Sequence, residues 1–240
     1  GEQRRVLDLI PTVEAHDRLR PVRTVHEGAA EQGWFSLGTM QEHGRAEGKK
    51  TMGLELAEQF GWRLPDTIIY PTGGGSGIVG MWNAFQQLKR LGLLQGDLPR
   101  LISVQEQGCH PLVDAMRSGG VFKPAGAEVD STPTGMRVPN PPDGQLITDI
   151  LRQSGGTAVA VTAEEIRCGA EVLGKHGISA SPEGAATWAG LVRLAEQGVV
   201  GPKEEVVLFN TAHAMKYLPW KEDSAVTVRN YEEWRSLVQR

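Results

Sequence analysis

Short, nearly continuous apolar runs alternate along the chain with segments in which apolar residues recur at helical spacing. The runs are rich in β-branched side chains and lie at residues 67–70, 101–104, 157–161 and 206–209. Such runs are typical of strands that are buried on both faces of a parallel sheet, because a strand with one exposed face alternates apolar with polar residues. The sequence therefore predicts four strands of one parallel sheet.

Helices are predicted between these strands. Apolar residues recur at intervals of four over 52–60, before the first strand, and form one stripe over 79–88, after it. A capping box of Thr162 and Glu165 opens a helix that is predicted to end near residue 173, and Ser181 caps a helix that is predicted to end near residue 196. Because strands and helices alternate, we expect right-handed βαβ units and an α/β fold with a doubly wound, mostly parallel sheet.

Two regions depart from this alternation. Residues 1–35 predict one strand, over about 5–10, and one helix, over about 12–28, and we expect them to be the tail of a smaller N-terminal domain. Residues 36–240 are the predicted large domain. Within it, the segment 123–143 is rich in proline and poor in apolar residues. We expect this segment to be an irregular connection that serves as a lid or a subunit contact.

The composition excludes several classes of function. The chain has 240 residues, a net charge of −4 and scattered basic side chains, so it has no broad basic field for nucleic acid or an anionic membrane. No stretch reaches the roughly 18 apolar residues that a membrane span requires. We expect a cytoplasmic protein with reduced cysteines. Neither Cys109 nor Cys168 belongs to a CxxC or Cys/His cluster, so no metal site is predicted.

The clearest chemistry lies in a glycine-rich loop, TGGGSG at residues 72–77, which follows the first strand and precedes a helix. Glycine loses much conformational entropy on folding, so a tight run of glycines requires a reason. The backbone N–H groups of such a loop, together with a helix N-terminus, favour a bound phosphate dianion. We expect the Ser76 hydroxyl to add a donor, and a side chain at Gly75 to obstruct the phosphate.

Two nucleotide motifs fit this loop less well. A Walker A loop places a lysine after its last glycine, and none follows here. Residues 75–80 match the dinucleotide pattern GxGxxG, and Glu106 follows the next strand at a somewhat long spacing. However, Pro71 and two additional glycines precede that match, whereas a dinucleotide-binding fold turns directly from strand to helix. From these residues alone, NAD stays open as an alternative ligand.

At this point the sequence resembles the threonine synthases of the fold-type-II pyridoxal-phosphate enzymes. The resemblance is carried by RAEGKKT, IYPTGGGSG, VQEQGC, EGAAT and LFNT, at residues 45–51, 69–77, 104–109, 183–187 and 208–211. It extends from about residue 27 to about residue 217. The glycine loop combined with the Asn-Thr ending is its most specific part, because related lyases and dehydratases share the loop and differ elsewhere.

The resemblance implies roles for individual residues. Those that would hold the phosphate of pyridoxal 5′-phosphate are Gly73, Gly74, Gly75, Ser76 and Gly77. Thr211 would hydrogen-bond the pyridine nitrogen with a neutral hydroxyl, and Arg45 would bind the substrate's phosphate, although a surface arginine that caps a loop is the alternative. Glu183 would lie near the cofactor or serve only as an acid in the first turn of a helix. His213 is expected to have a local structural role.

The activity implied by the resemblance is the conversion of O-phospho-L-homoserine and water to L-threonine and phosphate, a carbon–oxygen lyase reaction. The partners are then this small-molecule substrate and, as is common among relatives, a second copy of the chain in a homodimer. One alternative is another fold-type-II lyase, such as a threonine dehydratase or a diaminopropionate ammonia-lyase. The other is a non-catalytic module with the same fold.

Two departures from the family pattern limit these expectations. Ala212 and Ala214 stand where the family usually has glycines, and both would crowd the cofactor ring. The lysine that holds the cofactor covalently belongs to a motif that no lysine of this chain matches; the lysines are Lys49, Lys50, Lys89, Lys123, Lys175, Lys203, Lys216 and Lys221. We therefore expect that lysine upstream, this chain to be the C-terminal portion of the enzyme, and the chain by itself to be inactive. No catalytic residue is assigned within it.

Overall fold

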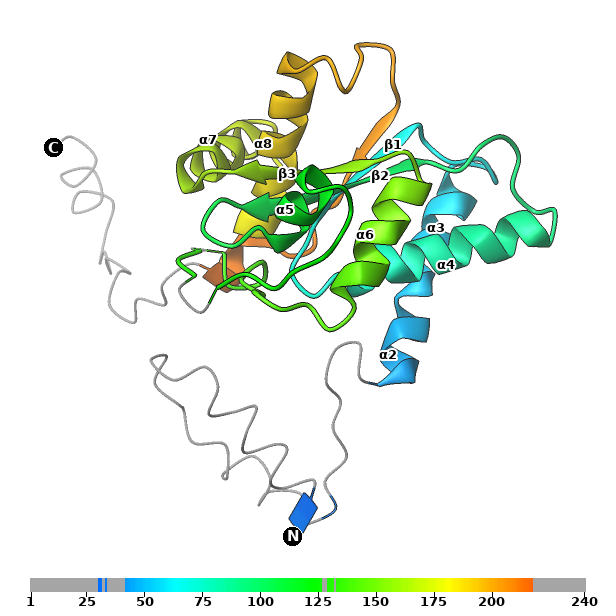
Figure 1. The fold of residues 1–240 in the computed structure, drawn as a ribbon. Coiled ribbons are helices and arrows are strands. Elements are labelled where there is room, and N and C mark those ends of the chain that lie inside the picture. The colour runs from blue at the N-terminus through cyan, green and yellow to red at the C-terminus, as the bar shows by residue number, and fades with distance from the viewer. Residues whose placement is uncertain (1–29, 32, 34–41, 127–128, 132, 218–240) are drawn as a thin grey trace, which may run out of the picture.

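The structure is a computed structural model that describes residues 30–31, 33, 42–126, 129–131 and 133–217. The strand predicted at 5–10, the helix predicted at 12–28 and the boundary between residues 35 and 36 lie outside the described residues. Within the described part, a central sheet is covered by helices on both faces (Figure 1).

Four parallel strands form the centre of this part: β1 (Thr67–Pro71), β2 (Arg100–Glu106), β3 (Thr157–Val161) and β4 (Val206–Leu208). Their order across the sheet is β3-β2-β1-β4. Ile69 of β1 pairs with Ile102 of β2 on one side and with Leu208 of β4 on the other. All four predicted strands are confirmed, with ends that shift by at most two residues. Because the strands are parallel, their carboxyl ends share one edge, which is where open α/β sheets bind ligands.

Helices form two layers around the sheet. In chain order they are α2 (His43–Gly48), α3 (Lys50–Gln59), α4 (Ser76–Arg90), α5 (Pro111–Arg117), α6 (Gly144–Gln153), α7 (Ala163–Lys175), α8 (Pro182–Glu196) and the 3₁₀ helix η1 (Ala214–Tyr217). Successive strand residues point to opposite layers. Ile68 and Leu101 belong to a core with α3, α4 and α6, whereas Ile69 and Ile102 belong to a core with α7 and α8. The predicted doubly wound fold is confirmed.

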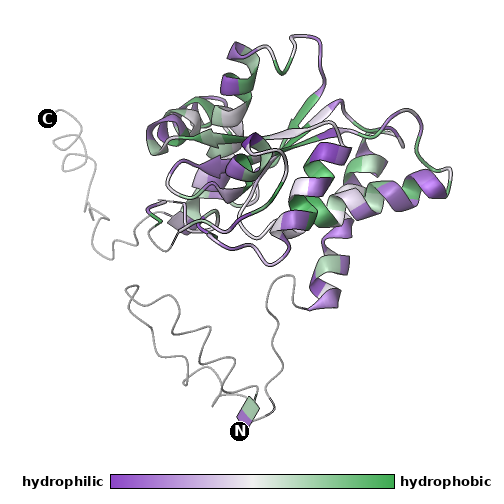
Figure 2. Ribbon diagram, viewed as in Figure 1, coloured by the Kyte–Doolittle hydropathy of each residue, from purple (hydrophilic) through white to green (hydrophobic). Residues whose placement is uncertain are grey.

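Hydropathy along α4 follows this layering (Figure 2). Met81 and Phe85 are fully buried against the sheet, and the last turn of the helix ends with the polar pair Lys89 and Arg90. All five residues of β1 are buried, as expected for a strand that has a neighbour on each side and a helical layer on each face. The apolar stripe predicted over 79–88 is therefore the face that fixes α4 on the sheet.

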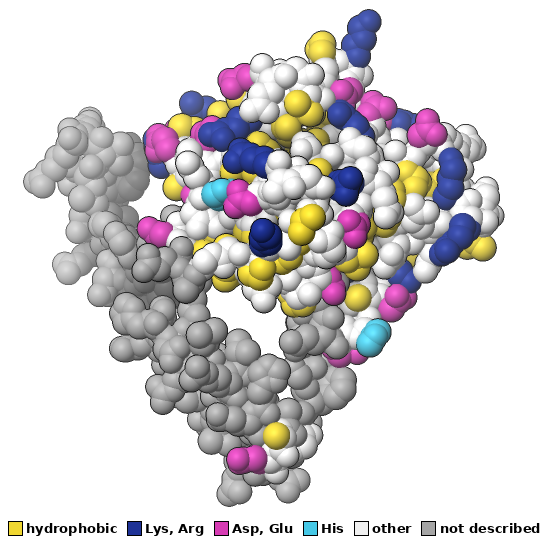
Figure 3. Space-filling view, viewed as in Figure 1, with side chains coloured by type: hydrophobic (Ala, Val, Ile, Leu, Met, Phe, Trp, Pro, Cys, Tyr) yellow, Lys and Arg dark blue, Asp and Glu magenta, His cyan; other side chains and the backbone are white. Residues whose placement is uncertain are grey.

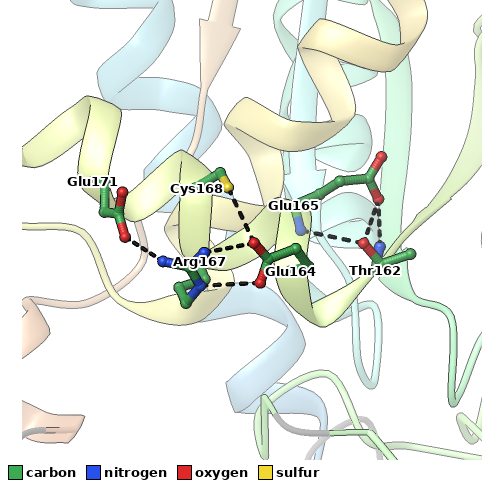
Figure 4. Close-up of polar contacts among 6 residues, drawn as sticks. All are labelled: Thr162, Glu164, Glu165, Arg167, Cys168 and Glu171. Carbon is green, nitrogen blue, oxygen red and sulfur yellow. Dashed lines mark hydrogen bonds and ion pairs between the residues drawn. The ribbon is translucent and has the colours of Figure 1, made fainter.

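The predicted N-termini of α7 and α8 are confirmed. Thr162 accepts a hydrogen bond from the N–H of Glu165 (3.2 Å), and the Glu165 carboxylate accepts one from the N–H of Thr162 (2.6 Å), which completes the capping box at α7 (Figure 4). Ser181 accepts from the N–H of Gly184 (3.1 Å) and caps α8. α7 continues two residues beyond its predicted end, and α8 ends at the predicted residue.

The proline-rich segment 123–143 forms turns but neither helix nor strand in its described residues. It is anchored by Met136, which is fully buried in the core with α7 and α8. A Cβ built on Gly73 would overlap the carbonyl oxygen of Gly135. The segment therefore covers part of the glycine loop at the carboxyl edge of the sheet.

Candidate active site

The glycine loop lies at the carboxyl end of β1 and leads directly into α4. Gly75 is the N-cap residue of α4 and has a φ of 78°, in the left-handed region that glycine adopts without strain. The helix begins at the next residue, Ser76. Its first turn contains no acidic residue. The positive end of the α4 dipole is thus presented at the sheet edge.

The backbone donors of this loop are unpaired. From Gly73 to Ile78, no N–H group donates a hydrogen bond to any acceptor in the described part of the chain. Gly74 and Ser76 are half-buried and form the accessible side of the loop, while their neighbours are buried. Backbone donors that are removed from bulk water without a partner are costly, so a run of them calls for an acceptor. A dianionic phosphate meets that demand and also complements the helix dipole.

Close packing is a second reason why residues 75 and 77 are glycines. A Cβ on Gly75 would overlap Ile147 of α6, and a Cβ on Gly77 would overlap the ring of Tyr70. The expectation that a side chain at Gly75 obstructs the phosphate is therefore incomplete, because that side chain would first enter the core. Replacing this glycine tests the fold rather than the ligand.

A buried glutamine fixes the base of the loop. Thr72 donates its N–H to the carbonyl of Val104 (2.8 Å), and its own carbonyl accepts from Nε2 of Gln105 (3.4 Å). Oε1 of Gln105 accepts the N–H of Leu112 in the first turn of α5 (2.9 Å). Gln105 is fully buried. Its role was missed by the sequence analysis, although a glutamine within an apolar strand is a signal that could have identified it.

Thr211 lies at the same edge of the sheet as the glycine loop. Strand β4 ends at Leu208, and Phe209 donates its N–H to Ile69 of β1 (3.1 Å), so the chain runs on beside the end of β1. The Thr211 side chain is exposed. The parallel register therefore brings the two predicted ends of the cofactor site, the phosphate end and the ring end, to neighbouring strands.

Asn210 ties this segment to the start of α8. Its side-chain amide donates to the carbonyl of Ser179 (3.2 Å), and its amide oxygen accepts from the N–H of Ser181 (3.3 Å). The carbonyl of Ala212 accepts from the same N–H (3.0 Å). His213 contacts Ser179 through Nδ1 (3.2 Å), in keeping with a local structural role. The Asn210 side chain and the Ala212 carbonyl thus fix the two neighbours of Thr211 to residues 179–181, a function of Asn210 that its sequence position alone does not show.

The two remaining predicted residues lie in different settings. Arg45 is exposed on the short helix α2, whose C-terminal neighbour Lys49 contacts α4 at Gly80. Glu183 is buried in the first turn of α8, and its Oε1 accepts the N–H of Gly135 (3.0 Å). The alternative interpretation of Glu183, as only an acid in the first turn of a helix, does not account for this burial and this contact.

An apolar cavity of about 410 Å³ lies beside the start of α8. Its lining includes Pro133, Ala180, Pro182, Ala214 and Tyr217. Ala214, which the resemblance predicts to crowd the cofactor ring, lines this cavity.

Acidic and basic side chains are interspersed over the face shown in Figure 3, with no continuous basic area. Among the described residues, no group of three or more His, Cys, Asp or Glu side chains is placed to hold a metal ion. Nor does any helix in this part combine the length and apolar character needed to cross a bilayer.

Comparison with known proteins identifies the family. Residues 9–212 match the model of the pyridoxal-phosphate dependent enzyme family. Threonine synthase from Methanosarcina acetivorans is 34% identical over 201 residues, which are 83% of this chain and 48% of the relative. Threonine synthase from Methanocaldococcus jannaschii is 33% identical over 173 residues, which are 72% of this chain and 42% of the relative. The chain thus spans about half the length of the curated relatives it matches.

Solved structures agree in fold. Threonine deaminase isoform 2 from Solanum lycopersicum superposes with a TM-score of 0.63 at 17% identity, covering 89% of this chain and 55% of that chain. Maize serine racemase gives a TM-score of 0.61 at 16% identity, covering 91% and 60%. The family match decides between the two ligands that the loop left open, in favour of pyridoxal phosphate over a dinucleotide. The chain belongs to the pyridoxal-phosphate dependent enzymes of fold type II.

Proposed function

We propose that this chain supplies the phosphate-binding and ring-binding parts of a threonine synthase, which converts O-phospho-L-homoserine and water to L-threonine and phosphate. The observation that carries the proposal is the run of unpaired N–H donors from Gly73 to Ile78 at the N-terminus of α4. The choice of reaction is supported by threonine synthases that are 33–34% identical over most of the chain.

The described residues fit pyridoxal phosphate at both ends. The loop offers several backbone donors and a helix N-terminus for the phosphate, with the Ser76 hydroxyl beside them. Thr211 offers a neutral hydroxyl for the pyridine nitrogen, and such a group does not favour a protonated ring as a carboxylate would. When bound, the cofactor supplies an electron sink for the removal of protons from the substrate.

The roles of the protein groups follow from their chemistry. Donors fixed before the ligand arrives orient the cofactor without further reorganisation, which keeps the ring and the substrate aligned. Arg45 is proposed to grip the substrate's phosphate, because a guanidinium binds phosphate through two parallel hydrogen bonds. Neutralising that phosphate favours its departure as a leaving group.

Covalent attachment of the cofactor is proposed to need a lysine outside this chain, since no lysine here lies in the family motif for it. Cofactor added to the chain, followed by borohydride, should then leave no stoichiometric adduct at one lysine. Scattered labelling of exposed lysines is compatible with this expectation. A single adduct at Lys216, together with phosphate release from O-phospho-L-homoserine, would show that the chain is a complete enzyme.

The reaction itself is tested by comparing two products in the whole enzyme. Threonine synthase activity gives phosphate from O-phospho-L-homoserine, whereas a dehydratase gives ammonia from L-threonine, and an ammonia-lyase gives ammonia from diaminopropionate. We expect phosphate release to dominate by kcat/KM. Ammonia release as the main reaction would assign the protein to another lyase of the family. Turnover of none of these substrates by a cofactor-loaded protein would favour a non-catalytic module.

A further inference from the structure

Glu183 is a charged side chain in an unusually buried place. It lies in the first turn of α8, yet only 5% of its surface is exposed. Its Oε1 accepts one hydrogen bond, from the N–H of Gly135 (3.0 Å), and its Oε2 makes no hydrogen bond with any described residue. Burying a carboxylate with so few partners is unfavourable, and the dipole of α8 offsets only part of that cost. The position therefore calls for a reason beyond helix stability.

The group that Glu183 holds is the peptide that covers the glycine loop. Gly135 points its N–H at Glu183, while its carbonyl oxygen lies against Gly73, where a Cβ would overlap it. A Cβ on Gly135 would lie 2.7 Å from Oε1 of Glu183. Gly135 is thus packed between the carboxylate and the loop, with little room on either side. Any shift of this carboxylate would be transmitted to the position of Gly73.

The other side of the carboxylate faces the segment that follows Thr211. Although Tyr217 is exposed over much of its surface, partial desolvation of its hydroxyl and the nearby Glu183 carboxylate raise the pKa of this hydroxyl to about 12. Tyr217 ends η1, and it lines the apolar cavity together with Pro133 and Pro182. In Figure 1, η1 lies beside the irregular segment that contains Gly135. Glu183 therefore stands between the phosphate end and the ring end of the proposed site.

We propose that Glu183 is a positioning residue, which acts through Gly135 to hold the glycine loop in the conformation that binds the cofactor phosphate. The inference rests on the proposed function, since it assigns the loop to that phosphate. What matters is the reach of the side chain and its acceptor oxygen, not its charge. This separates the proposed role from that of an ordinary acid at a helix N-terminus.

Three variants distinguish reach from charge. Glu183→Gln keeps the length and an acceptor for the Gly135 N–H but loses the charge. Glu183→Asp keeps the charge and the dipole interaction but is one methylene too short. Glu164→Ala is the matched control, because Glu164 is the acid at the same position in the first turn of α7. Each is measured in the full chain for amide hydrogen exchange at residues 73–78 without ligand, and for affinity toward pyridoxal phosphate and inorganic phosphate.

We expect Glu183→Asp to speed exchange at residues 73–78 and to weaken cofactor binding, each about tenfold. Glu183→Gln should stay within about threefold of the wild type in both measurements, and Glu164→Ala should leave both unchanged. The reverse pattern, with Glu183→Asp like the wild type and Glu183→Gln impaired, would show a charge effect and overturn the proposal. Equal exchange and binding in all variants would overturn it as well.

The proposed function fails in a different way. If the wild-type chain bound neither pyridoxal phosphate nor inorganic phosphate at the loop, the phosphate assignment would be wrong, whatever the variants do to hydrogen exchange. If the wild-type chain binds these ligands and the Glu183 variants do not differ from it in hydrogen exchange or affinity, the phosphate assignment stands and the role of Glu183 is refuted. Should Glu183→Asp not fold, Gly135→Ala perturbs the same contact from the other side, because its Cβ would lie 2.7 Å from Oε1 of Glu183. It should speed exchange at residues 73–78 and weaken cofactor binding, and wild-type values in both measurements would overturn the role of Glu183.

Discussion

The polar groups at the amino ends of the four strands, here the amino edge of the sheet, are arranged differently from those at the carboxyl ends. At the amino edge, polar groups satisfy one another: Glu204 accepts hydrogen bonds from Thr67 (3.0 Å) and from the N–H of Gly201 (2.9 Å), and it pairs with Arg100. At the carboxyl edge, the donors of the glycine loop find no acceptor among the described residues. The first arrangement stabilises the fold, whereas the second leaves binding capacity for a ligand.

The electrostatics of the amino edge support this contrast. The Gly201 N–H, the Thr67 hydroxyl and the Arg100 guanidinium lower the pKa of Glu204, although partial burial opposes them. Arg63 lowers the pKa of the neighbouring Glu205, with which it forms an exposed ion pair. Carboxylates held in this way contribute stability at neutral pH. The glycine loop, in contrast, has no acidic side chain in the first turn of α4 that would compete with a bound anion.

The largest expected effect comes from placing an acid at the carboxyl edge. Ser76→Asp adds a negative charge at the first residue of α4. This charge interacts favourably with the helix dipole but repels a phosphate dianion. We expect the Kd for pyridoxal phosphate to rise about 100-fold, with an unchanged or slightly raised melting temperature. Binding is measured by fluorescence titration and stability by thermal unfolding.

The matched control is Ala163→Asp, which makes the same charge change at the first residue of α7. It should leave cofactor affinity within about twofold of the wild type. If both variants weakened binding equally, the effect would come from net charge, and the glycine loop would lose its assignment.

A substitution at the amino edge should have the opposite profile. Glu204→Ala removes the acceptor shared by Thr67, Arg100 and the N–H of Gly201, so we expect the free energy of unfolding to fall by about 1–3 kcal/mol. Cofactor affinity should not change. Glu205→Ala, which breaks only the exposed pair with Arg63, should shift the unfolding midpoint much less than Glu204→Ala does. Urea unfolding gives both values from the shift in midpoint; a loss of cofactor affinity in Glu204→Ala would contradict the separation of roles.

Thr211→Val sharpens the comparison within the carboxyl edge. The change removes one hydroxyl from an exposed side chain, so stability should stay within about 0.5 kcal/mol of the wild type. If Thr211 hydrogen-bonds the pyridine nitrogen, affinity for pyridoxal phosphate should fall about five- to tenfold, while affinity for inorganic phosphate stays the same. Equal losses for both ligands would place Thr211 near the phosphate, and no loss would remove it from the site.

The smallest expected effect concerns a carboxylate at the start of α7, which is fully paired. Burial raises the pKa of Glu165, but the N–H and hydroxyl of Thr162 and the guanidinium of Arg193 outweigh this and lower it below its ordinary value of 4.5. Because the pKa in the folded chain is lowered, the stabilisation is present above pH 4.5 and is lost as the pH falls below that value. Melting temperatures from pH 7 to pH 3 should fall less steeply for Glu165→Gln than for the wild type; parallel slopes would contradict this assignment.

Figure 4 shows the polar contacts at the start of α7, a helix that, like α4, begins at the carboxyl edge of the sheet. Besides the capping box, Arg167 pairs with Glu164 and Glu171 along the helix surface. At this helix start the N–H groups of Thr162 and Glu165 already have side-chain acceptors. Every helix leaves its first N–H groups without intrahelical partners, but at α4 the unpaired run continues back into the preceding loop as far as Gly73, and this longer run is what marks the loop as a binding site.

The sequence was sufficient for the strands and for most helices, because buried parallel strands and capped amphipathic helices have strong local patterns. The capping box of Thr162 and Glu165 is entirely local, and it was predicted correctly. The helices α2, α5 and α6 were not predicted. With 6 and 7 residues, α2 and α5 are too short to carry a clear periodicity, and their formation depends on packing against the rest of the fold. The helix α6 is as long as α3 and has a regular apolar face that includes the buried Ile147 and Ile150, so its pattern was present in the sequence and was missed.

The site was predictable in part, for a related reason. Consecutive glycines signal a special backbone conformation wherever they occur, and the fold then places the loop at the carboxyl edge. The burial of Gln105 and Glu183 depends instead on neighbours that are distant in sequence, Thr72 and Gly135. The packing of Ile147 against Gly75 is likewise invisible before the helices are placed. Residues that position a loop are therefore harder to identify from sequence than the loop itself.

The most direct test of the account is to observe the loop amides while the ligand is added. Nuclear magnetic resonance of the isotopically labelled chain, titrated with pyridoxal phosphate and separately with inorganic phosphate, reports each N–H group on its own. We predict saturable shifts for the amides of residues 73–78 with both ligands, and shifts near Thr211 with pyridoxal phosphate alone. If residues 73–78 did not respond while other amides did, the unpaired donors would not be the phosphate site, and the central claim would be wrong.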